Sequence, residues 1–187
     1  MAYRSGTYVA FHAEGNSHPT ETDMKYYRLL QAWHDHEDIE FALVNSHDKA
    51  SAVRDSSKRE TLRRSLMERL RNSRNMVLII GDSTWRDTDW VPFEIGQAID
   101  TYKIPIIATY PDYLNITNPG ALRPFWPAAL AQRIDDGTAH VIHIPFRQGP
   151  IKHAIKTFDY DNYPLGGGLG IYSLESYAAW GLVQTSA

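Results

Sequence analysis

The sequence contains no cysteine, and this absence excludes disulfide bonds, thiolate zinc sites and a cysteine nucleophile. It also lacks any apolar run near the roughly 20 residues that a membrane-spanning helix needs. The net charge is only -3, so no excess of positive charge draws the chain toward nucleic acid. We therefore expect neither a membrane nor a nucleic acid as a partner.

What remains is the composition of an ordinary globular protein, with 43% hydrophobic and 22% charged residues. A length of 187 residues suits one domain, which would bury roughly 70% of its unfolded surface. The first residues, MAYRSGTYVAFHAEG, enter a short strand-like run without the apolar region and cleavage site of a secretory signal. Together with the missing cysteines, this pattern predicts a cytoplasmic protein.

Strand-like and helix-like segments alternate along the chain. Short apolar or β-branched runs predict five strands, at residues 7–11, 39–44, 75–81, 104–110 and 139–146. Parallel strands joined through helices form a sheet that is covered on both faces. We therefore expect a doubly wound, flavodoxin-like α/β fold with a mostly parallel five-stranded sheet in the order 2-1-3-4-5.

Two regions depart from this alternation. Residues 111–138 carry four prolines and predict an irregular insertion with one short helix. Residues 160–187 are poor in charge and rich in glycine and aromatic residues, so we expect an irregular C-terminal extension that packs on the domain, residues 1–159, or on a second copy. Within it, the run GGGLG at 166–170 is interpreted as a flexible link, because it neither follows a βα strand nor opens a clear helix.

The expected strand order predicts where a ligand would bind. In a doubly wound sheet, ligands bind beyond the carboxyl ends of the strands, at the point where the strand order reverses. Here that rule selects residues that follow the first and third strands: Phe11, His12, Asp82, Ser83 and Trp85.

The helix after the third strand carries one acid, Glu94, near the start of an otherwise apolar segment. With Asp89 as N-cap, Pro92 falls in the first turn and Glu94 lies within about two turns of the positive helix end. Its angular position is on the flank of the apolar stripe, beside Trp90 and Gln97. Partial burial would raise the pKa of this carboxyl and the helix dipole would lower it, so the sequence leaves the direction open.

Three motifs resemble those of the TIR domain superfamily, and most closely the bacterial TIR-like proteins of Thoeris antiphage defence. The motifs are YVAFH at the first strand, NMVLIIGDST after a basic helix, and WVPFEIGQAI, in which a tryptophan precedes an acid by four positions. The resemblance covers about residues 5–110. Val91 and Pro92 stand where many enzymatic TIR domains have a small residue or cysteine, and the family does not account for residues 111–138 or the C-terminal extension.

The resemblance implies a TIR-like enzyme that cleaves the nicotinamide–ribose bond of NAD+. NAD+ would be the substrate, with no separate cofactor and no metal. The product would be ADP-ribose or a cyclic isomer that signals to a separate effector protein, and the active form would be a homo-oligomer. A carboxylate suits this reaction because the departing nicotinamide leaves an oxocarbenium-like ribose, which a nearby negative charge can stabilise or trap.

Site roles follow from the same resemblance together with crevice position. Glu94 is the candidate catalytic acid. Phe11 and Trp85 are candidates to stack on the bases, and His12 to bind ribose or phosphate oxygens. The remaining candidate substrate-binding residues are Asn45, Ser46, Asp82, Ser83 and Trp90. Core packing is the more ordinary role for Trp90.

Two other functions suit the same pattern. A nucleoside deoxyribosyltransferase-like enzyme also uses a glutamate on a small doubly wound domain, and a non-catalytic TIR-like scaffold would use Glu94 only as a helix-start acid. The run HDHED, residues 34–38, predicts no metal site, because residues two positions apart do not share a helix face.

Overall fold

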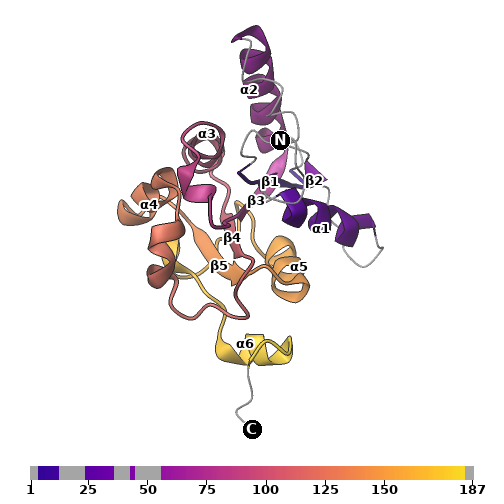
Figure 1. Cartoon of the computed structure of the whole chain (residues 1–187), viewed down its shortest axis with the longest axis vertical. Helices are drawn as coiled ribbons and strands as arrows, with labels where there is room; N and C mark the ends of the chain where they lie inside the picture. The colour runs from indigo at the N-terminus through magenta and orange to yellow at the C-terminus, as the bar shows by residue number, and fades with distance from the viewer. Residues whose placement is uncertain (1–3, 13–23, 36–42, 45–55, 184–187) are drawn as a thin grey trace.

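Five parallel strands form the central sheet of the computed structural model, which describes residues 4–12, 24–35, 43–44 and 56–183 (Figure 1). The strands pair in the order β2-β1-β3-β4-β5, and all pairs are parallel. The expected doubly wound fold and its strand order are thereby confirmed. The strands are β1 Gly6–Ala10, β2 Leu43–Val44, β3 Ser73–Ile79, β4 Ile106–Tyr110 and β5 Val141–Pro145.

Helices cover both faces of this sheet and create two separate hydrophobic cores. One core lies beneath α2 Ser56–Arg71, α3 Trp90–Gly96 and α4 Ala128–Asp135. The other lies beneath α1 Met24–Asp35, α5 Gln148–Thr157 and α6 Leu174–Ala179. Figure 1 shows α3 and α4 on one side of β4 and β5, with α5 on the other. None of the helices within the described ranges is both long and apolar enough to span a bilayer.

Strand β1 illustrates how the sequence divides between these cores. All five of its residues are buried, and successive side chains point to opposite faces, as the pleat requires. Tyr8 and Ala10 enter the core under α2 and α3, whereas Val9 enters the core under α1 and α5. A residue on this strand can therefore reach α3 only from an even-numbered position.

The insertion at 111–138 contains more regular structure than we expected. It forms a 3-10 helix, Pro119–Phe125, followed by α4. Trp126, between these helices, is buried and donates a hydrogen bond from Nε1 to the Tyr110 hydroxyl at 2.8 Å. The insertion is therefore fixed to the end of β4.

The GGGLG segment is not a flexible link, and that interpretation was wrong. Gly170 pairs with the outer edge of β5: the His143 amide donates to its carbonyl at 2.9 Å, and its own amide donates to the Val141 carbonyl at 3.0 Å. The glycines permit this pairing because a Cβ on Gly170 would lie 2.6 Å from two carbonyl oxygens, and one on Gly168 would lie 2.9 Å from Ile134. The segment thereby covers the edge strand of the sheet.

Replacing Gly170 by Ala is expected to lower the free energy of unfolding by about 1–3 kcal/mol, because the two carbonyl groups facing the new methyl belong to the backbone and must move. Urea denaturation measures the change. Gly120→Ala is the matched control, since a Cβ there would lie 3.5 Å from the nearest atom outside the neighbouring residues. Equal stability of both variants would show that the edge contact tolerates added volume.

Candidate functional site

Glu94 is completely buried, on α3, against the first strand. The Tyr8 hydroxyl donates a hydrogen bond to Glu94 Oε1. Burial, followed by the charge of Glu94, raises the pKa of Tyr8 well above its usual range, so this phenol stays protonated and remains a donor at neutral pH. We expected partial burial at the flank of the helix, whereas the structure seats the carboxylate fully inside.

The start of α3 is held by an aspartate that the sequence analysis passed over. Asp87 Oδ1 accepts hydrogen bonds from the amides of Asp89 at 2.9 Å and Trp90 at 3.0 Å. Its other oxygen, Oδ2, lies 3.0 Å from His12 Nδ1, just beyond β1. One carboxylate therefore joins the end of the first strand to the first amides of α3.

Asp89 stands at the N-cap position, as expected, but within the described residues its side chain makes no capping hydrogen bond. Its carboxylate instead forms an ion pair with Arg59 of α2. The role assigned to the Asp89 side chain is therefore corrected: Asp87 supplies the cap, because its carboxylate and not that of Asp89 meets the free amides of the first turn.

Arg59 also connects α2 to the tryptophan of the WVPFE motif. Its guanidinium lies 5.3 Å from the centroid of the Trp90 ring, the geometry of a cation–π contact. Trp90 is buried, and among the described residues its Nε1 finds no hydrogen-bond partner. Burying an indole N–H without an acceptor is costly, which makes this atom a candidate donor to a ligand.

The loop after β3 is shaped by Thr84, whose Oγ1 accepts from the Gly81 amide at 2.8 Å. Trp85 follows with 47% of its surface exposed, and its Nε1 donates to the Asp82 carbonyl at 2.9 Å. The Asp82 side chain is exposed, and Ser83 is half-buried. The loop therefore presents an aromatic face and polar groups at the carboxyl end of β3.

The predicted site residues fall into three groups. His12, Asp82, Ser83, Trp85, Trp90 and Glu94 lie on or beside the carboxyl ends of β1 and β3 and the helix between β3 and β4. Phe11 lies elsewhere: it is buried on the opposite face of the sheet and stacks on Tyr27 of α1, with ring centroids 5.0 Å apart. Asn45 and Ser46 fall outside the described residues.

Three contacting residues escaped the sequence analysis: Tyr8, Asp87 and Arg59. The two-residue periodicity of β1 places Tyr8 and Val9 on opposite faces of the sheet, but it does not say which face α3 covers. Asp87 lies two positions before the expected N-cap and could have been considered as the cap. The described parts of the chain contain no group of three or more His, Asp or Glu side chains arranged to hold a metal ion.

Removing the Tyr8 hydroxyl tests how much it stabilises the buried carboxylate. Tyr8→Phe is expected to lower the free energy of unfolding by about 1.5–3 kcal/mol, because a hydrogen bond to a buried charge is lost. Chemical denaturation of a double-mutant cycle with Glu94→Gln isolates the pair. We expect the tyrosine substitution to cost less in the glutamine background, and purely additive effects would refute the coupling.

Comparison with known protein families gives one match. A family model described as the Thoeris protein ThsB, TIR-like domain, matches residues 8–116, which run from Tyr8 through β4 and include all of α3. No curated protein matches the chain significantly. The match covers more than half of the chain and confirms the resemblance drawn from its three motifs. The chain therefore belongs to the TIR-like domain family of the Thoeris protein ThsB.

Proposed function

We propose that this chain is an NAD+-cleaving enzyme of antiphage defence, in which Glu94 stabilises the ribose cation formed as nicotinamide departs. The observation that carries the proposal is the position of Glu94: a fully buried carboxylate, oriented by Tyr8, on a helix tied to the carboxyl end of β1 through Asp87 and His12. Family membership supports the same assignment.

Burial matters to this chemistry because the attraction between a carboxylate and a developing positive charge grows as water is excluded. Breakage of the C1′–N bond sends the bonding electrons to nicotinamide, which leaves as a neutral molecule. The ribose then carries the positive charge, and Glu94 provides the compensating negative charge. Water attacking C1′ would give ADP-ribose, and a nucleophilic atom of the same molecule would give a cyclic isomer.

The surrounding residues suit the remainder of the substrate. Trp85 offers an exposed aromatic face for a base, and the indole N–H of Trp90 lacks a protein acceptor within the described residues. His12 is the candidate for contacts with ribose or phosphate oxygens. Phe11 is the weakest member of the set, since its ring already stacks within the opposite core. The product would pass to a separate effector, and activity would require assembly of several copies.

Chromatography of nucleotides from cells that express the protein, with and without phage challenge, tests the function. We expect NAD+ to fall and nicotinamide to appear together with ADP-ribose or a cyclic isomer. Exchange of bases on added deoxynucleosides, with NAD+ untouched, would instead identify a deoxyribosyltransferase. Unchanged NAD+ in challenged cells that are nevertheless protected from phage would identify a scaffold.

A further inference from the structure

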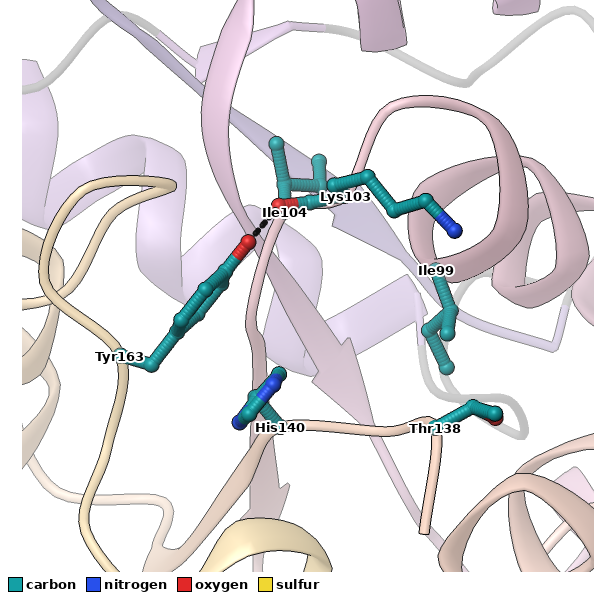
Figure 2. A pocket seen from close by; sticks show the side chains of 6 residues that line it. All are labelled: Ile99, Lys103, Ile104, Thr138, His140 and Tyr163. Carbon is teal, nitrogen blue, oxygen red and sulfur yellow. Dashed lines mark hydrogen bonds between the residues drawn. The ribbon is translucent and has the colours of Figure 1, made fainter. Parts of the chain in front are cut away.

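A second site lies next to the amino ends of β4 and β5, at the end of the sheet opposite to the carboxyl ends of the strands. It is a pocket of about 120 Å³ lined by Ile99, Lys103, Ile104, Thr138, His140 and Tyr163 (Figure 2). His12 follows β1 at the other end of the strands, whereas Glu94 lies on α3 against Tyr8, in the middle of β1. None of the candidate NAD+-site residues lines this pocket.

The backbone at Lys103 is unusual. With φ at 54°, Lys103 is the one non-glycine residue of the described ranges in the left-handed region. Lys103 follows a π-helical turn, Gln97–Thr101. Just after Lys103, the Ile104 amide donates to the Ala98 carbonyl at 3.0 Å, and this bond closes the end of the helix. Glycine adopts this conformation without steric cost, so a lysine here retains a side chain at the expense of backbone strain.

Tyr163 fixes the strained turn from across the pocket. Its hydroxyl donates to the Lys103 carbonyl at 2.7 Å, as Figure 2 shows. The Tyr163 ring also stacks on His140, with centroids 4.1 Å apart and planes inclined by 11°. The π-helical turn, the β5 start and the C-terminal extension are thereby joined around one small space.

Two basic side chains, Lys103 and His140, line this space. Neither the Lys103 ammonium nor the His140 ring forms a hydrogen bond or ion pair with any residue that the structure describes. Asp100, one turn earlier, bonds to Arg133 through both carboxylate oxygens, and its charge also attracts that of Lys103 without a hydrogen bond between them. Ile99 and Ile104 supply apolar walls, and attraction between a cation and an anion is stronger beside such walls than in water.

We propose that this pocket binds a small oxyanion of the phosphate class, held by the Lys103 ammonium and the imidazole of His140. At about 120 Å³ the pocket is smaller than the roughly 300–1,000 Å³ of sites that enclose drug-sized ligands, so it suits a small ion better than a whole nucleotide. The Thr138 and Tyr163 hydroxyl groups donate their protons elsewhere, to Asp136 and to the Lys103 carbonyl, so Lys103 and His140 are the two donors to the anion. The ligand is thus free phosphate or the terminal phosphate of a molecule whose remainder lies outside.

Titration of the purified full chain with inorganic phosphate, at constant ionic strength with chloride as reference, tests the proposal. We expect a saturable shift of the His140 ring resonances and a rise in Tm, neither of which chloride produces. Lys103→Gln keeps the aliphatic stem but removes the charge, so it should weaken phosphate binding at least about tenfold. No saturable response in the wild type, or equal affinity in this variant, would overturn the proposal.

Lys103→Gly separates ligand binding from folding. Because glycine relieves the left-handed strain, its Tm without phosphate should equal or exceed that of the wild type, by up to about 3 °C, while its phosphate response disappears. Retention of the phosphate response in this variant would contradict a site built on the ammonium. Parallel titration with ribose 5-phosphate identifies the source: binding that also depends on Lys103 indicates a phosphate monoester, and binding of inorganic phosphate alone indicates the free ion.

Discussion

Glu94→Gln is expected to lower NAD+ turnover by about 10²–10³-fold, the usual cost of removing one preorganised electrostatic group from a reaction centre. Glutamine has nearly the same shape as glutamate but carries no charge, so it cannot stabilise a ribose cation. It can still accept the hydrogen bond that Tyr8 donates. The substitution therefore removes the charge while leaving the contact to β1 in place.

Controls separate this loss from misfolding. Glu94→Gln should retain a cooperative unfolding transition, because burying a neutral amide costs less than burying a carboxylate. Asp100→Asn is the matched variant: it removes an exposed acid from the π-helical turn that continues α3, and it should leave turnover unchanged. A comparable loss of turnover in Asp100→Asn would attribute the effect to general electrostatics and not to Glu94.

Acidification from pH 6.5 to about pH 4 is expected to cost the protein about 3 kcal/mol of stability through His143 alone. This side chain is fully buried on β5, and burial lowers its pKa from 6.5 to about 4. Nε2 lies 2.9 Å from the Gly168 carbonyl and must donate to it, so Nδ1 accepts from the Tyr110 hydroxyl at 2.8 Å. The neutral imidazole thereby satisfies both neighbours.

The direction of the stability change follows from the pKa values of His143 in the unfolded and folded chains. Below pH 6.5 the unfolded chain takes up a proton at His143, whereas the folded protein takes it up only near pH 4. Stability from this group is therefore complete above pH 6.5 and falls steadily between these limits, at about 1.4 kcal/mol per pH unit. The carboxyl groups of Asp100 and Asp135 have pKa values lowered by Arg133 and Arg123, so their contributions disappear only at lower pH.

Denaturation curves measured from pH 7.5 to pH 4 for the wild type and His143→Gln isolate this contribution. Glutamine offers an N–H donor and a carbonyl acceptor but does not titrate in this range. As the pH falls, the free energy of unfolding should decrease more steeply for the wild type than for the variant. An equal pH dependence of the free energy of unfolding in both proteins would show that His143 has the same pKa in the folded and unfolded chains, and would contradict a buried neutral ring.

The fold could be predicted because each strand is a short apolar run and every crossover except that between β4 and β5 contains a helix-length segment. Strand order followed from the commonest winding of such units. The C-terminal extension could not be predicted in the same way, since its pairing with β5 depends on glycines that allow backbones to approach closely. Nothing in the sequence GGGLG distinguishes such a contact from a loose connection.

The candidate site was predictable only where topology alone decides position. His12 and the loop after β3 follow directly from strand ends. The burial of Glu94 does not follow from the strand ends, because it depends on the rotation of α3 about its axis over β1 and on the position of the Tyr8 hydroxyl. Phe11 was named because it ends the first strand, but the pleat turns its ring to the other face of the sheet.

Quantifying nicotinamide and NAD+-derived products in phage-challenged cells shows whether the buried Glu94 carboxylate supports loss of nicotinamide from NAD+. Wild type and Glu94→Gln are compared at equal protein abundance. We expect abundant nicotinamide from the wild type and at most about 1% of that amount from the variant. Equal nicotinamide release from both proteins would contradict it.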